Sequence, residues 1–74
     1  MQDKLKNIIN MIRENKGMEP LEILKLGYSL RDEIGFDSFD LAELTVRCEA
    51  EFDIDIFEDD IVETVGEVLD RLNG

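Results

Sequence analysis

Hydrophobic residues recur at helical spacing near the start of the chain. They lie three or four positions apart, which places them on one face of a helix: Leu5, Ile8, Ile9 and Ile12. The pattern predicts a helix over residues 3–16. Gly17 would end it, because glycine readily adopts the left-handed backbone of a helix terminus.

Residues 18–36 form a long connection to the next periodic segment. A structureless connection of that length is uncommon in a compact domain, so we expect this one to be ordered. Pro20 predicts a short helical turn over residues 21–26, which Gly27 would end. Two apolar residues are expected to hold the remainder against the core, Leu30 and Ile34.

A second helix is predicted over residues 38–52, where helical periodicity resumes. One side carries the expected core stripe: Leu41, Leu44, Cys48 and Phe52. The opposite side carries a second apolar strip with an acid beside it: Phe39, Ala42, Val46 and Glu43. Such a strip is either a docking surface or covered by the connection 18–36. The pattern leaves both open for Phe39 and favours docking for Val46.

The last third of the chain predicts an extended segment and further helical structure. Residues 52–56 alternate apolar and acidic, which alone would indicate a strand, but no second strand is available, so we expect an extended segment. Its inward residues would be Ile54 and Ile56. A short helical turn is predicted over residues 58–62, with Ile61 and Val62 inward. Thr64 and Glu67 then form a capping box before a last helix that ends at about Leu72. Its expected buried face is Val65, Val68, Leu69 and Leu72.

These elements predict one all-α domain over residues 1–74. We expect a small bundle of three main helices plus one short helix, with a long loop between the first two main helices. The chain has 74 residues, 43% of them hydrophobic and 36% charged, which suits a compact domain with a small core.

The net charge of −11 lies almost entirely in the second half, because residues 1–37 carry −1 and residues 38–74 carry −10. Nucleic acid and anionic membrane surfaces are therefore poor partners. We expect a monomer whose partners present basic patches.

Several kinds of chemistry are excluded by composition. Without histidine, the chain lacks Ser-His and Cys-His catalysis and the usual zinc ligands, and we predict no catalytic residue and no metal site. The acidic run 53–60 does not fit a calcium loop, because Phe57 and Glu58 stand where a ligand and a glycine are required. The single cysteine, Cys48, falls on the core stripe, so we expect a small buried hydrophobe. No secretory or long apolar segment is present, and we expect a cytoplasmic protein.

Ser38 stands where the loop after Gly35 becomes a helix. The free backbone N–H groups at a helix start favour a phosphate nearby, so a phosphate esterified to Ser38 would be stabilised. The simpler interpretation is that Asp37 or Ser38 caps the helix.

The stretch Gly35-Phe36-Asp37-Ser38-Phe39-Asp40, followed by an acidic amphipathic helix, resembles the modification site of acyl carrier proteins. Thr64-Val65 before the last helix and the long ordered loop are also similar, and the resemblance covers residues 28–72. It implies that Ser38 receives 4'-phosphopantetheine from coenzyme A, and that the thiol of this arm carries acyl groups as thioesters. The chain would then be a carrier for fatty-acid or polyketide-type biosynthesis, not an enzyme.

The resemblance also implies partners and a surface that contacts them. The partners would be a phosphopantetheinyl transferase and the enzymes that load and transfer acyl groups. The residues that match the partner-contacting positions are Asp37, Phe39, Asp40, Glu43, Val46 and Glu49.

Three residues depart from the family pattern. Phe39 replaces a leucine, Arg47 adds a positive charge to the acidic face, and Phe57 replaces a proline. Two alternative functions stay open: an aminoacyl or peptidyl carrier, and an unmodified acidic adaptor that binds a basic partner through the Phe39, Ala42 and Val46 strip.

Overall fold

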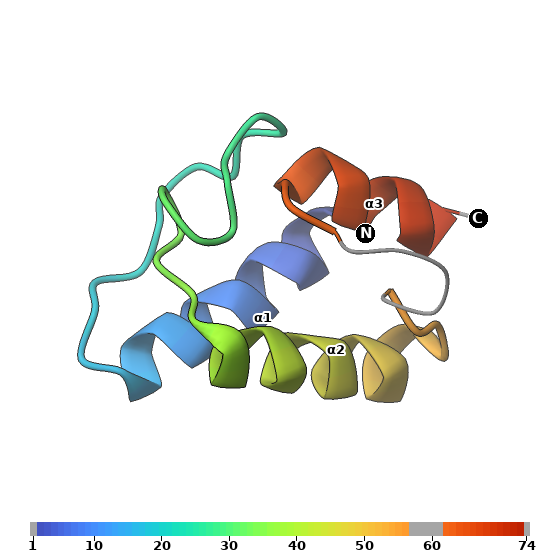
Figure 1. Ribbon diagram of the computed structural model, residues 1–74, viewed down its shortest axis with the longest axis horizontal. Coiled ribbons are helices and arrows are strands. Elements are labelled where there is room, and N and C mark those ends of the chain that lie inside the picture. Colours follow the sequence, from blue (N-terminus) through green and yellow to red (C-terminus); the bar gives the residue numbers. More distant parts are fainter. Residues whose placement is uncertain (1, 57–61, 74) are drawn as a thin grey trace.

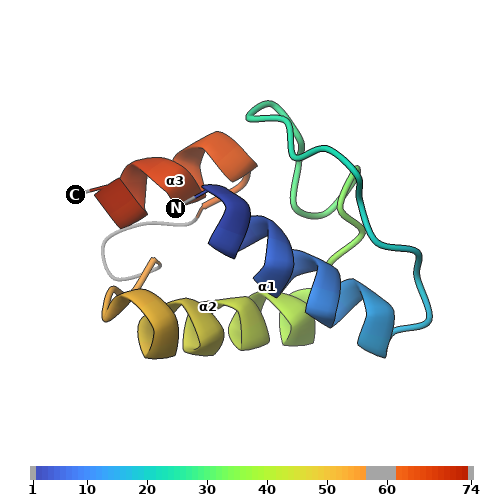
Figure 2. The same cartoon turned by 180° about the vertical axis from the view of Figure 1, so that it is seen from behind.

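The computed structural model describes residues 2–56 and 62–73. Its element order is α1 (Gln2–Asn15), α2 (Ser38–Phe52) and α3 (Val65–Asn73). Helix α1 packs beside α2, α3 lies across from α2, and the connection between α1 and α2 wraps around one end of the molecule (Figures 1 and 2). The all-α class is confirmed, and within the described residues no helix is long and apolar enough to cross a membrane.

Helices α1 and α2 run antiparallel, as three contacts along their seam show. Lys4 near the start of α1 pairs with Glu51 near the end of α2 at 3.4 Å. In the middle, Arg47 lies 2.9 Å from the sulfur of Met11. Beyond the end of α1, Lys16 pairs with Asp40 in the first turn of α2.

The core is built from the apolar faces that the sequence predicts. Leu44 and Cys48 of α2 are fully buried, and Leu41 and Phe52 pack at its edge. The predicted faces of the other two helices are buried as well: Leu5, Ile8, Ile9, Ile12, Val65, Val68, Leu69 and Leu72. Leu30 and Ile34 are also buried, which confirms that they hold the connection to the core.

The first part of the connection is extended and lies along a polar stripe of α1. The stripe consists of four residues spaced three or four positions apart, each of which donates a side-chain hydrogen bond: Gln2, Lys6, Asn10 and Arg13. The acceptors, each at 3.0 Å, are in the same order the carbonyl oxygens of Leu24, Glu22, Leu21 and Glu19. Asn10 also accepts from the backbone N–H of Leu21 at 2.7 Å.

The predicted helical turn over residues 21–26 is therefore wrong. Helix α1 supplies hydrogen-bond partners for the backbone of this segment, so an extended chain satisfies its polar groups without internal helical bonds. A single turn forms only at its end, where the N–H of Tyr28 donates to the carbonyl of Lys25 at 3.1 Å.

The second part of the connection is bonded to the start of α3. The N–H groups of Val65 and Gly66 donate to the carbonyls of Tyr28 and Leu26, at 3.0 and 2.8 Å. In the opposite direction, the N–H of Leu30 donates to the backbone carbonyl of Glu63 at 2.8 Å. The predicted capping residue Thr64 accepts from the N–H of Glu67 at 3.2 Å, as a helix cap should.

Helix α2 ends at Phe52, as predicted, and Asp53 forms its C-terminal cap. Asp53 adopts the left-handed conformation, with φ 58°, and its N–H donates to the Glu49 carbonyl at 2.8 Å. After it the chain runs without pairing into a strand, and Ile56 is buried while Ile54 is half-buried, as predicted. Val62 is also buried, whereas the rest of the predicted turn 58–62, with Ile61, lies outside the described residues.

Candidate functional site

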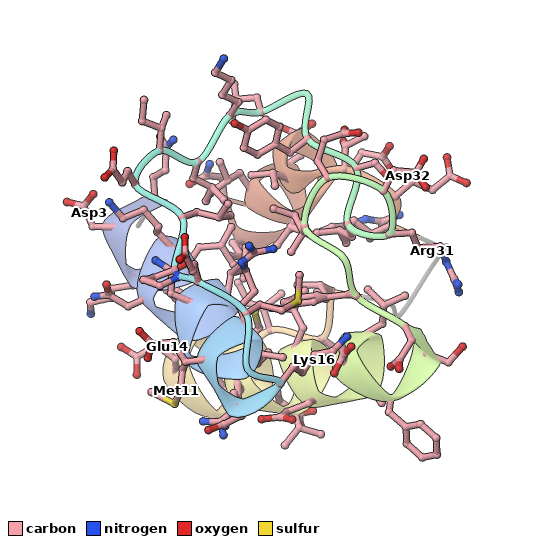
Figure 3. All side chains as sticks on the ribbon, turned by 90° about the vertical axis from the view of Figure 1, so that its left-hand side faces the viewer. Asp3, Met11, Glu14, Lys16, Arg31 and Asp32 are labelled. Atoms are coloured by element: carbon pink, nitrogen blue, oxygen red, sulfur yellow. The ribbon has the colours of Figure 1, made fainter. Side chains whose placement is uncertain are left out.

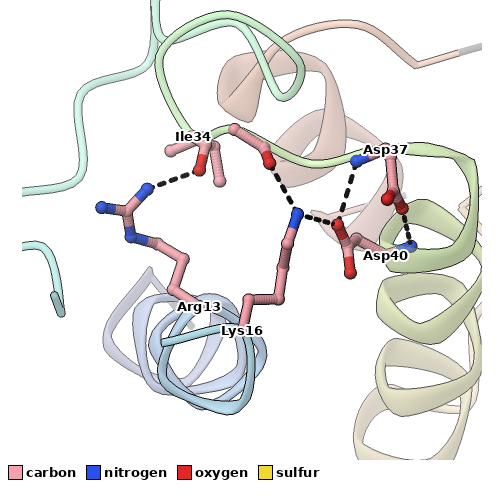
Figure 4. Close-up of polar contacts among 6 residues, drawn as sticks. Arg13, Lys16, Ile34, Asp37 and Asp40 are labelled. Carbon is pink, nitrogen blue, oxygen red and sulfur yellow. Dashed lines mark hydrogen bonds and ion pairs between the residues drawn. The ribbon is translucent and has the colours of Figure 1, made fainter. Parts of the chain in front are cut away.

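Ser38 is the first residue of α2, and Asp37 caps the helix. The Asp37 side chain accepts from the N–H of Asp40 at 3.0 Å, and the Asp40 side chain accepts from the N–H of Asp37 at 3.0 Å. This reciprocal capping box (Figure 4) assigns the capping role to Asp37 and leaves Ser38 exposed. The serine thus lies between two residues that fix its backbone, and its hydroxyl is not needed as the cap.

The loop before Ser38 is anchored by the buried side chain of Phe36 and turns at a glycine with positive φ. Phe36 is buried, and its N–H donates to the Leu30 carbonyl at 2.8 Å. Gly35 has φ 84°, and a Cβ added there would lie 2.8 Å from the terminal methyl carbon of Met18. Glycine adopts this positive φ without strain, whereas a larger residue would be strained and would also displace the end of the Met18 side chain.

Two cations from the end of α1 hold this loop from the other side (Figure 4). Arg13 is 9% exposed, and its guanidinium donates to the carbonyls of Glu19 and Ile34. The Lys16 ammonium donates to the Gly35 carbonyl at 2.9 Å and to the Asp40 carboxylate. Figure 3 shows Lys16 pointing from α1 toward the start of α2, while Met11 and Glu14 lie on the outer surface.

The sequence did not reveal these contacts. The helix dipole favours cations such as Arg13 and Lys16 at the end of a helix whatever they contact, so their presence alone indicates no partner. Their spacing was the available signal, because residues three apart lie on the same side of a helix.

Asp40 is buried within this network, with 7% of its surface exposed. Burial tends to raise the pKa of its carboxyl group, but the hydrogen bonds from Lys16 and Asp37 outweigh that effect, so the pKa lies below the ordinary value for aspartate. Asp40 is therefore a structural carboxylate held by Asp37 and Lys16. It is the one predicted partner-contacting residue that the structure buries.

The other predicted contact residues lie at or near the surface. Phe39 is 86% exposed and Val46 65% exposed, so neither is covered by the connection 18–36. Asp37 and Glu49 are also exposed. Glu43 is half-buried and accepts a hydrogen bond from Arg47 at 2.7 Å, which partly neutralises its charge. We call Asp37, Phe39, Ala42, Val46 and Glu49 the exposed α2 face.

A pocket of about 310 Å³ opens one helical turn beyond Ser38. It lies between residues 29–32 of the connection, Leu41 of α2, and residues 62–64 before α3. Its lining combines the apolar side chains of Leu30, Leu41 and Val62 with charged and hydroxyl groups. A flexible group attached at Ser38 could reach it, because one helical turn rises only about 5 Å.

The polypeptide offers no nucleophilic thiol at this site. Cys48 is fully buried in the core, and burial raises the pKa of its thiol to about 11, so the unreactive protonated form predominates at neutral pH. Leu44, Val65 and Val68 belong to the same core cluster and are also fully buried. Within residues 2–56 and 62–73, no three acidic or thiol side chains gather as a metal site would require.

Comparisons with known proteins agree with this geometry. The family model described as "Phosphopantetheine attachment site" matches residues 6–72. A relative named acyl carrier protein, from Zymomonas mobilis subsp. mobilis, is 36% identical over 73 residues, which are 99% of this chain and 91% of the relative. No solved structure matches at a significant level.

Proposed function

This chain belongs to the acyl carrier protein family and carries a covalently attached 4'-phosphopantetheine, and on that premise we propose that Ser38 is the attachment residue. The resemblance drawn from the sequence is thereby confirmed at the level of the family. Proteins of this family are carriers of acyl groups. The polypeptide presents the prosthetic group to partner enzymes, and the thiol of that group supplies the reactivity that the side chains lack.

The choice of Ser38 is supported by the local geometry. Its side chain is exposed, Asp37 takes the role of helix cap, and the helix start favours the negative charge of a phosphodiester. The chain has two serines, and the other is less suitable. Ser29 is half-buried, and its hydroxyl accepts a hydrogen bond from the N–H of Asp32 at 3.1 Å.

The proton of the Ser38 hydroxyl must be removed by the transferase in this proposal. The chain has no histidine, and both neighbouring carboxylates are engaged. Asp37 accepts from the N–H of Asp40, and Asp40 is bonded to Lys16. A general base has to lie within hydrogen-bond reach of the proton that it takes, so a partner enzyme would supply that base.

We infer that partner enzymes dock on the exposed α2 face. Phe39 and Val46 offer apolar contact area, and Asp37 and Glu49 flank it with negative charge. Apolar contact supplies affinity, while complementary charge accelerates association with a basic surface. Asp40 would act indirectly, by fixing the helix start, and Glu43 would contribute less charge because Arg47 is paired with it.

The acyl groups would be those of fatty-acid or polyketide-type biosynthesis. The pocket lined by Leu41 is a place where part of the arm or a short acyl group could rest, because Leu41 lies one helical turn from Ser38 and the lining is partly apolar. An aminoacyl or peptidyl cargo would require loading by a different class of enzyme.

The attachment residue can be tested by mass spectrometry. The chain is incubated with coenzyme A, Mg²⁺ and a broad-specificity phosphopantetheinyl transferase. We expect the intact mass to rise by one phosphopantetheine in the wild type and in Ser29→Ala, and to stay unchanged in Ser38→Ala. A folded Ser38→Ala variant that is still modified would contradict the assignment, and a wild type that is never modified would favour an unmodified adaptor.

A further inference from the structure

We propose that Lys16 is a positioning residue for the modification of Ser38: it ties the turn that carries the serine to α1 and balances the negative charge around it. The inference rests on the proposed function of Ser38. It concerns a residue of the first helical segment, outside the exposed α2 face.

The Lys16 backbone is firmly attached to α1. Its N–H donates to the carbonyls of Ile12 and Arg13 at 3.3 and 3.0 Å, so the residue continues the last turn of the helix. Its ammonium group therefore extends from a rigid element. A side chain held in this way can restrain whatever it bonds.

The ammonium bonds the chain on both sides of Ser38. It donates to the Gly35 carbonyl, three residues before the serine, at 2.9 Å, and to the Asp40 carboxylate, two residues after it. The same Asp40 oxygen accepts from the N–H of Asp37 at 3.0 Å. Lys16 thus bonds the Asp40 carboxylate of the capping box and the Gly35 carbonyl before it, and links the turn that carries Ser38 to α1 (Figure 4).

Lys16 also supplies positive charge where the modification adds negative charge. Asp37 and Asp40 flank Ser38 closely, and a phosphodiester would be a third anion beside them. Arg13, the neighbouring cation, donates to the carbonyls of Glu19 and Ile34, whereas Lys16 pairs directly with Asp40. Without Lys16, the buried Asp40 carboxylate would lose this ion pair, and leaving a buried charge uncompensated destabilises the folded protein.

A positioning role can be distinguished from a docking role by kinetics. About 29% of the Lys16 side chain is exposed, so a transferase could in principle touch it. Loss of a docking contact raises KM and depends on salt, because contacts between exposed charges are screened. Loss of positioning lowers kcat, because a misplaced hydroxyl reacts more slowly after binding.

The experiment compares Lys16→Met, Lys16→Arg and Lys4→Met with the wild type as substrates of the transferase. Lys4→Met is the matched control, because it removes the same charge and another α1–α2 ion pair, at the far end of the seam. All four are assayed at a temperature at which circular dichroism shows them folded. We expect kcat to fall about fivefold or more in Lys16→Met with little change in KM, and to stay within about twofold in the other two.

A second measurement tests the charge balance. Urea midpoints are determined for each variant before and after phosphopantetheinylation. Lys16→Met should lower the midpoint more in the modified protein than in the unmodified one, whereas Lys4→Met should lower both equally.

Two results would overturn the proposal: an unchanged kcat in folded Lys16→Met, or a loss of rate that resides only in KM. An equal loss of midpoint in both forms would remove the charge-balancing role. A wild type that is not modified at all would instead contradict the assignment of Ser38.

Discussion

Replacement of Asp40 by asparagine should make the stability of the protein less dependent on acid. The wild-type carboxylate is buried and is bonded to the N–H of Asp37 and to the Lys16 ammonium. Asparagine has the same shape and can still accept the bond from Asp37. It loses the charge that pairs with Lys16, so the substitution isolates the ionic part of this network.

The magnitude follows from two opposing effects. A hydrogen bond to a charged group contributes about 1.5–3 kcal/mol, whereas asparagine avoids part of the cost of burying a carboxylate. We therefore expect the free energy of unfolding at pH 7 to fall by about 1–2 kcal/mol, a considerable part of the stability of a small domain.

The sign of the pH effect follows from the depressed pKa of Asp40 in the folded protein. A carboxyl group of this kind contributes stability above its unfolded pKa, about 3.9 for aspartate, and that contribution is lost as the pH falls through the folded pKa. The difference between wild type and Asp40→Asn should thus be complete at pH 7 and should shrink as the pH falls below about 4.

Urea unfolding followed by circular dichroism at pH 7, 5 and 3 measures this difference. Glu14→Gln serves as the control, because it removes the same charge from an exposed position on α1 and should change stability by less than about 0.5 kcal/mol. The reasoning is refuted if the two variants behave alike, or if the deficit of Asp40→Asn is as large at pH 3 as at pH 7.

Three further predictions concern the exposed α2 face and the end of α2. Phe39→Ala should weaken transferase binding, seen as a KM raised several-fold with an unchanged unfolding midpoint, because Phe39 makes little contact within the fold; an unchanged KM would exclude it from docking. Arg47→Gln should raise kcat/KM of the transferase reaction about twofold at low salt and not at high salt, because it removes the positive charge that is paired with Glu43. Arg71→Gln makes the same charge change on α3 and should have a smaller effect. Asp53→Gly should stabilise the protein by about 0.5–1 kcal/mol relative to Asp53→Ala, because both remove the charge and only glycine accepts φ 58° freely; equal urea midpoints would contradict this.

The helices could be predicted from the sequence because each buries a face of regular period. Ile9 and Leu44, for example, recur with their neighbours every three or four residues, and both are fully buried. The bounds of α2 were predicted correctly for the same reason, aided by the cap residues at its start.

The connection between α1 and α2 could not be predicted in detail, because its conformation depends on distant residues. Pro20 and the leucines after it are compatible with a helical turn, but the side chain of Asn10 bonds the backbone of Leu21 in an extended form. Local preference is overruled when another element supplies the hydrogen bonds.

The position of Ser38 was predictable from its local motif, whereas the surroundings of Asp40 were not. The family resemblance implies that Asp40 is a partner-contacting residue, and it does not reveal a lysine 24 positions earlier that binds its carboxylate. Phe39 is the opposite case, because its pattern allowed two environments and the fold leaves it 86% exposed.

The hydrogen bonds from α1 to the connection make the backbone path of residues 19–24 independent of the side chains that those residues carry. The bonds reach main-chain carbonyls at residues 19–24, which every amino acid possesses. The outward side chains there, Ile23 among them, can therefore be exchanged without altering the path of the backbone. A library that varies those positions while retaining α1 would give this carrier new surfaces on an unchanged scaffold.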